Sequence, residues 1–128
     1  MAYLLDTSVL IDLRDGDPYV ARQVAAFDDA VVMSVVSRVE LEGGVYRTPA
    51  DIPIRRARLD TMLSAISALA FEDADARAYS AIVAAAGYSR HKLIDRMIAA
   101  QAILHRAVLV TRNPAAFADI RGLDLLSL

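Results

Sequence analysis

Five short apolar runs, separated by longer segments of mixed polarity, set the pattern of this sequence. They are Tyr3–Leu5, Ala30–Val36, Leu69–Phe71, Ala107–Thr111 and Leu123–Leu128. The runs are continuously apolar, and the second is rich in β-branched residues, which is typical of strands buried on both faces. Because the intervening segments have helical character, the pattern predicts βαβ units, a parallel sheet and an α/β fold.

Capping residues mark the expected helix starts. Three of them precede a proline, which predicts an N-cap followed by Pro at the first helical position: Asp17, Thr48 and Asn113. Ser37 and Glu40 have the spacing of a capping box. Asp73 is expected to cap an Ala-rich helix that ends near Gly87, and a further helix is expected over residues 93–106.

Composition narrows the chemistry. A chain of 128 residues with 56% apolar residues predicts one folded domain over residues 1–128 and excludes intrinsic disorder. The absence of Cys excludes disulfide scaffolds, thiolate zinc sites, iron–sulfur clusters and thiol nucleophiles. His91 and His105 are too isolated to form a His-rich metal site. Carboxylate oxygens remain as metal ligands, and these suit Mg²⁺ or Mn²⁺.

The charge pattern bears on partners and location. A net charge of −2 gives no global attraction for nucleic acid, so any such binding must be local. Two basic clusters stand out, at residues 55–58 and at residues 90–92. The longest uncharged run, residues 78–89, is shorter than the roughly 20 residues of a membrane span. No basic segment precedes Asp6, so no signal peptide is predicted, and we expect a cytoplasmic protein with no membrane contact.

Polar residues follow the predicted strands at positions where α/β proteins bind ligands, outside the carboxyl ends of parallel strands. They are Asp6, Glu40, Asp95 and Asn113. Each has a structural alternative: helix capping for Asp6 and Asn113, the capping box for Glu40, and the helix dipole for Asp95. The other acids near the first helix, such as Asp12, are expected to be solvated.

Two observations favour a functional role over these alternatives. Asp95 shares a helix face with apolar residues such as Ile98 and Ala102, where a carboxylate needs a partner, a cation or a raised pKa. Glu40 is followed by Gly43 and Gly44, which are costly inside a helix and suggest close approach of another backbone or a ligand. Three converging carboxylates repel one another, and a divalent cation would relieve that repulsion.

Four sequence segments together resemble the PIN-domain ribonucleases, and more narrowly the VapC toxins of bacterial type II toxin–antitoxin pairs. They are Leu4–Ile11 (LLDTSVLI), Ser37–Leu41 (SRVEL), Leu93–Ala102 (LIDRMIAAQA) and Leu109–Asn113 (LVTRN) with Phe117. The segments occur in the order typical of that family and cover residues 3 to about 117. The resemblance implies a PIN-like three-layer α/β/α domain with a five-stranded parallel sheet.

By the same resemblance, Asp6, Glu40 and Asp95 are the three acids of the site. Asp6 and Asp95 would be the principal Mg²⁺ ligands, with Mn²⁺ as the alternative ion, and Glu40 would ligate directly or through water. The fourth family position falls on Asn113, where many members have Asp. This departure puts a second strongly held metal in doubt. Asp119 would compensate for it from the following helix, with an ordinary surface acid as the favoured alternative.

Further residues receive roles from the resemblance. Thr7, Ser8 and Thr111 would orient the carboxylates or bound waters, with helix capping and strand-end hydroxyls as the alternative. Arg112 would grip an RNA phosphate, unless it is an ordinary surface arginine. Arg90 and Lys92, with His91 between them, are candidates for RNA contact, and a solvated loop is the alternative.

The function that the resemblance implies is a metal-dependent endoribonuclease toxin that cleaves structured RNA, either tRNA or ribosomal RNA, and so inhibits translation and growth. A VapB-like antitoxin would inhibit it by laying a peptide tail across the acidic cleft. We also expect a symmetric homodimer and a toxin–antitoxin hetero-oligomer. The alternative is a catalytically weak or inactive PIN domain that serves as a protein-binding module, a hypothesis supported only by Asn113.

Overall fold

The computed structural model describes all 128 residues, and it contains one parallel sheet with the strand order β3-β2-β1-β4-β5. The strands are β1 (Tyr3–Leu5), β2 (Val31–Ser34), β3 (Ser67–Leu69), β4 (Val108–Thr111) and β5 (Leu125–Ser127). The α-helices are α1 (Thr7–Arg14), α2 (Pro18–Ala25), α3 (Val35–Val45), α4 (Ile52–Ala65), α5 (Asp73–Ala86) and α6 (Leu93–Leu104). Three short 3₁₀ helices complete the chain, η1 (Pro49–Asp51), η2 (Arg90–Lys92) and η3 (Pro114–Phe117). None of the helices combines the length and the apolar character that crossing a membrane would require.

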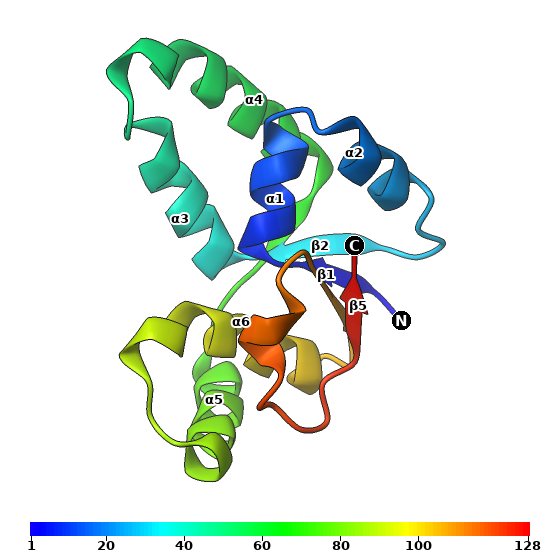
Figure 1. The fold of residues 1–128 in the computed structure, drawn as a ribbon, viewed down its shortest axis with the longest axis vertical. Coiled ribbons are helices and arrows are strands. Elements are labelled where there is room, and N and C mark those ends of the chain that lie inside the picture. The colour runs from blue at the N-terminus through cyan, green and yellow to red at the C-terminus, as the bar shows by residue number, and fades with distance from the viewer.

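The helices form a layer on each side of the sheet, so the predicted α/β/α architecture is confirmed. Figure 1 shows α1 to α4 above the sheet and α5, α6 and η3 below it. In the same view, α3 and α4 form an arm that extends away from the strands beside α1. The first strand lies in the middle of the sheet, so the residue that follows it reaches the centre of the molecule.

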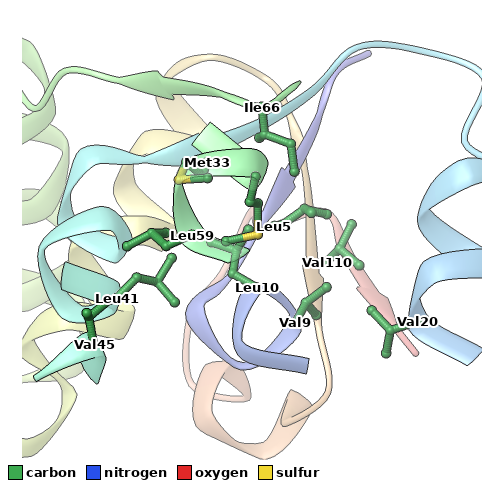
Figure 2. Packing of buried hydrophobic residues seen from close by; sticks show 11 residues of the cluster. Leu5, Val9, Leu10, Val20, Met33, Leu41, Val45, Leu59, Ile66 and Val110 are labelled. Carbon is green, nitrogen blue, oxygen red and sulfur yellow. The ribbon is translucent and has the colours of Figure 1, made fainter. Parts of the chain in front are cut away.

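Alternate strand residues fill two separate cores, as expected for strands covered on both faces. Leu5 and Val110 belong to the core under α1 to α4, whereas their neighbours Leu4 and Leu109 belong to the core under α5 and α6. All four side chains are fully buried. Figure 2 shows the first of these cores, in which side chains of the central strands meet side chains of α1, α2, α3 and α4.

Several predicted boundaries are corrected by the structure. The second strand ends at Ser34 rather than at residue 36, because the Ser34 hydroxyl accepts a hydrogen bond from the Val36 N–H and caps α3. The third strand lies two residues earlier than predicted, at residues 67–69, and the fourth and fifth strands are slightly shorter than predicted. The α3 helix therefore begins before Ser37, and the predicted Ser37–Glu40 capping box is wrong.

The other capping predictions have mixed outcomes. Asp17 caps α2 as predicted, by accepting a hydrogen bond from the Val20 N–H at 3.1 Å. Pro49 begins η1 rather than an α-helix. The N-cap of α5 is Glu72 rather than Asp73, and Asp75 completes a capping box there. Asn113 makes no side-chain capping bond, and α6 ends at residue 104 rather than 106.

Candidate metal centre

Asp6 lies directly after β1, at the carboxyl end of the central strand, and is almost completely buried. Its backbone N–H donates to the Val110 carbonyl of β4 at 2.9 Å, which fixes the residue against the neighbouring strand. Its Oδ1 accepts hydrogen bonds from the Val9 N–H at 3.0 Å and from the Ser8 hydroxyl at 2.6 Å. Asp6 is therefore both the N-cap of α1 and a candidate metal ligand, so the structural and functional interpretations of this residue are compatible.

The second oxygen of Asp6 is oriented from β4. Asp6 Oδ2 accepts a hydrogen bond from the buried Thr111 hydroxyl, which itself accepts one from the Asn113 N–H at 2.9 Å. A carboxylate oxygen has two acceptor directions, so Oδ2 keeps one that no protein group uses. Ser8 and Thr111 thus hold the Asp6 side chain in one orientation and leave an oxygen available to a cation.

Glu40 lies in α3 and reaches toward the first turn of α1. Its Oε1 lies 2.7 Å from the Thr7 hydroxyl, which also lies 2.9 Å from the Ser37 hydroxyl. A carboxylate only accepts hydrogen bonds, so Thr7 donates its single proton to Glu40 and accepts from Ser37. Ser37 is fully buried, and this supporting role was not predicted because the sequence pattern had suggested a helix cap.

Asp95 lies in the first turn of α6, half-buried, and its carboxylate accepts no hydrogen bond from the protein. Burial raises the pKa of this carboxyl above its ordinary value, and the nearby charges of Asp6 and Glu40 raise it further. Lys92 opposes this rise more weakly. The structure therefore brings the three predicted acids together from three different segments of the chain, at the cost of mutual repulsion.

The donor set fits a hard divalent cation that keeps part of its hydration shell. No group of three or more His, Cys, Asp and Glu side chains is arranged so that it could hold a metal ion by itself. Mg²⁺ is commonly bound through one or two carboxylates together with several waters. A free acceptor direction on Asp6, the unbonded carboxylate of Asp95 and the repulsion at Asp95 agree with that mode. Glu40 then fits as a ligand through water.

Asn113 and Asp119 differ in their surroundings. Asn113 is exposed, and its side chain makes no hydrogen bond. Asp119 accepts hydrogen bonds from Lys92 at 3.1 Å and from the buried Arg96 at 2.9 Å. These bonds, from Lys92 first and then from Arg96, hold the pKa of Asp119 below its ordinary value. Asp119 is thus committed to joining α6 to the segment after η3, so the prediction that it compensates for Asn113 is not supported.

Arg112 is bound by two carboxylates, those of Asp12 and Asp17, and does not form an open cationic site. We call this group the clamp, and we call Asp6, Glu40 and Asp95 the acid cluster. Its Nη1 lies 3.0 Å from Asp12 Oδ2 and 3.1 Å from Asp17 Oδ2. Its guanidinium carbon lies over the Tyr19 ring, 5.7 Å from the ring centroid. The hydrogen bond that Arg112 donates to Asp12, followed by the one that it donates to Asp17, raises the pKa of Arg112. Two carboxylates already neutralise this side chain, which weakens the prediction that it grips a phosphate. Asp12, expected to be solvated, is instead part of this clamp.

The predicted basic loop is only partly available. Arg90 and His91 are exposed in η2 and form no ion pair, whereas Lys92 is paired with Asp119. Arg90 therefore remains a candidate for RNA contact, and Lys92 has a structural role.

Comparison with known proteins identifies the family. The family model described as "PIN domain" matches residues 3–123. The chain belongs to the PIN domain family. No curated protein matches the sequence at a significant level.

Several solved structures of toxin–antitoxin complexes are similar to this chain over nearly its whole length. A chain of a toxin–antitoxin complex from Klebsiella pneumoniae is 27% identical, with a TM-score of 0.77, and the match covers 98% of this chain and 96% of that one. A chain of VapBC-5 from Mycobacterium tuberculosis is also 27% identical, with a TM-score of 0.73 and coverage of 99% and 98%. A chain of VapBC-1 from nontypeable Haemophilus influenzae is 25% identical, with a TM-score of 0.80 and coverage of 99% and 98%. The predicted resemblance to the PIN proteins of VapBC pairs is confirmed over the whole chain.

Proposed function

We propose that this PIN protein is an Mg²⁺-dependent endoribonuclease toxin of a type II toxin–antitoxin pair, with Mn²⁺ as the alternative ion. The observation that carries the proposal is the proximity of Asp95 in the first turn of α6 to Asp6 after β1 and to Glu40 in α3, where burial and like charge raise the pKa of Asp95. Such repulsion is expected where a divalent cation completes the charge balance. The substrate class we propose is structured RNA, either tRNA or ribosomal RNA.

The residues have distinct roles in this proposal. Asp6 and Asp95 would hold the ion directly, and Glu40 would hold a water bound to it. Ser8 and Thr111 keep the Asp6 carboxylate in its orientation, and Thr7 does the same for Glu40. When bound, Mg²⁺ would lower the pKa of a ligated water and stabilise the charge that grows on the phosphoryl oxygens during hydrolysis. The protein would contribute positioning and electrostatics.

The proposed partner is a VapB-like antitoxin. The relatives from K. pneumoniae, M. tuberculosis and H. influenzae are described as toxin–antitoxin or VapBC structures. In this chain, Val39 and Tyr46 of the α3 region are 67% and 60% exposed, and Val39 directly precedes Glu40. A peptide tail with apolar side chains and an Arg would suit both features, since Arg binds a carboxylate with two parallel hydrogen bonds. A homodimer and a hetero-oligomer with the antitoxin are part of the proposal.

The test is cleavage of RNA by the purified chain with and without Mg²⁺, alongside an Asp95→Asn variant. We expect cleavage that requires the metal and is lost in the variant, and growth arrest on expression that co-expression of the antitoxin relieves. Absence of metal-dependent cleavage, together with harmless expression, would contradict the enzyme and favour the alternative of an inactive PIN domain that only binds proteins.

A further inference from the structure

A polar cavity of about 480 Å³ opens next to the acid cluster, between α1 and the arm formed by α3 and α4. Thr7 and Glu40 form part of its lining, so the cavity is continuous with the proposed metal centre. Three arginines from separate parts of the chain also line it: Arg14, Arg47 and Arg55. Its volume lies in the range typical of small-molecule sites.

Arg14 lines this cavity, and its almost completely buried side chain is held in place by Asp15. Its Nε lies 3.1 Å from Asp15 Oδ1, and its Nη2 lies 3.5 Å from Asp15 Oδ2. Its Nη1 makes no hydrogen bond within the chain. The Cβ of any residue larger than glycine at position 44 would lie 3.3 Å from this Nη1. The close approach predicted from Gly43 and Gly44 is therefore made at Gly44 by a guanidinium rather than by another backbone, and nothing lies within 4 Å at Gly43.

The other two arginines come from the far side of the same glycine. Arg55 Nη1 donates to the Gly44 carbonyl at 3.0 Å, and its Nη2 lies 3.8 Å from Asp51. Arg47 is exposed and forms no ion pair or hydrogen bond. By contrast, the neighbouring Arg56 is bound to Glu42 and Asp60 and joins α3 to α4. Arg47 and the Nη1 of Arg14 thus make no hydrogen bond within the chain, whereas all three guanidinium nitrogens of Arg56 do.

The charge around the cavity is balanced in the metal-free protein. Arg14 is paired with Asp15 and Arg55 with Asp51, which leaves Arg47 and Glu40 without an ion pair. A cation bound at the acid cluster would offset the charge of Glu40 and leave Arg47 without a balancing acid, which favours an anion. Guanidinium groups with unused donors match the geometry of phosphate oxygens.

We propose that this cavity binds a backbone phosphate of the RNA substrate adjacent to the phosphate that is cleaved. The inference rests on the proposed function, and it assigns substrate binding to Arg47, Arg55 and Arg14 in place of Arg112 and Lys92, which are paired with acids. A strand whose cleaved phosphate lies at Asp6 and Asp95 reaches the cavity past Thr7 and Glu40. The arginines would then fix the register of the strand without reading its bases.

Arg47→Gln is the primary test, because its side chain has no partner in the chain and the substitution does not endanger folding. The variant is made in an Asp95→Asn background, so that binding is measured without cleavage. Affinity for a short fluorescein-labelled single-stranded RNA is followed by fluorescence anisotropy over a range of salt concentrations. We expect Arg47→Gln and Arg55→Gln each to weaken binding roughly three- to tenfold and to reduce the slope of log K against log salt by about 0.7.

Arg77→Gln is the matched control. It removes the same charge from an exposed position on α5, on the opposite side of the sheet. Arg14→Lys keeps the positive charge of this buried residue but removes the planar guanidinium and its paired donors. We expect this variant to weaken RNA binding as well. In chains with Asp95 intact, Arg47→Gln is expected to raise KM and leave kcat unchanged, which marks lost substrate binding.

Two results would overturn the proposal. One is an Arg47→Gln affinity and salt slope equal to those of Arg77→Gln. The other is that Arg47→Gln and Arg55→Gln weaken binding of a hexaglutamate peptide but not binding of the RNA. The cavity would then recognise an acidic protein segment. Failure of the proposed function is separate, since it would appear as absence of metal-dependent cleavage by the wild-type chain, whereas this test measures binding.

Discussion

Two groups of carboxylates lie near the carboxyl ends of β1 and β4. The negative charge of one group is balanced by an arginine of the protein, and that of the other group is not. In the clamp, Asp12 and Asp17 share the guanidinium of Arg112. A backbone hydrogen bond from Val20, together with Arg112, holds the pKa of Asp17 below its ordinary value. In the acid cluster, no Lys or Arg forms an ion pair with any of the three carboxylates, and the pKa of Asp95 is raised.

The difference shows how to separate structural acids from functional ones in this chain. Acids that stabilise the fold are satisfied by a cation of the protein, as Asp119 is by Lys92 and Arg96. Acids that are kept close together without such a cation lower the stability of the metal-free protein. We interpret that unfavourable arrangement as the sign of a site that an external cation completes.

The largest expected effect is the loss of RNA cleavage when one carboxylate of the acid cluster is removed. Asp6→Asn keeps a residue able to cap α1 but removes a carboxylate from the cluster. We expect RNA cleavage to fall on the order of 100-fold or more, because a lost ligand removes several kcal/mol of transition-state stabilisation. Asp12→Asn makes the same chemical change in the clamp and should leave cleavage within a few-fold of wild type. Equal losses in both variants would mean that the two groups do not differ in function.

A second prediction concerns stabilisation by the metal. Mg²⁺ at 100 times its Kd should stabilise the wild-type chain by about 2.7 kcal/mol, because it binds only the folded state. The measurement is the Tm with and without Mg²⁺. Asp95→Asn should abolish most of this increase, whereas Asp12→Asn should retain it. An identical response of Asp95→Asn and wild type would place the bound metal elsewhere.

A third prediction follows from the raised pKa of Asp95. Because its pKa is higher in the folded chain than in the unfolded chain, ionisation of Asp95 favours unfolding. The metal-free protein therefore loses stability as the pH rises through the raised pKa, and it recovers that stability as the pH falls toward the ordinary value near 3.8. Metal-free Asp95→Asn should melt on the order of 2–4 °C above wild type at pH 7, and the difference should disappear in acid. A Tm difference that does not change with pH would contradict this origin.

The smallest effect is expected at the fourth family position. Asn113→Asp adds a formal charge beside the cluster, so the Mg²⁺ or Mn²⁺ titration midpoint should fall by roughly three- to tenfold. Titration by calorimetry measures this directly, with wild type as the reference. An unchanged midpoint would show that residue 113 does not contact the metal.

The sequence predicted the fold well because the fold depends on local signals. Apolar runs located all five strands, and their continuous character indicated burial on both faces. The observed helix boundaries differ from the predicted ones where the N-cap is another residue than expected. Ser34, not Ser37, caps α3. Nothing local distinguishes those two serines, because the choice depends on where β2 stops pairing with β1 and β3.

The sequence predicts the three candidate acids but not the contacts around them. Asp6, Glu40 and Asp95 follow from their positions after strands and from the resemblance to PIN proteins. The ion pairs of Arg112 with Asp12 and of Lys92 with Asp119 join segments far apart in sequence, and no periodic pattern encodes such contacts. For that reason the sequence placed RNA binding at Arg112 and Lys92, which the structure shows paired with acids.

The most direct test of the central claim is the position of a bound ion in crystals of the wild-type chain soaked with Mn²⁺, located by its anomalous scattering. The claim predicts a peak within ligand distance of Asp6 and Asp95, with Glu40 linked to it through water, and no peak in crystals of Asp95→Asn. A peak at the clamp of Asp12 and Asp17, or no peak at the acid cluster at saturating Mn²⁺, would contradict it.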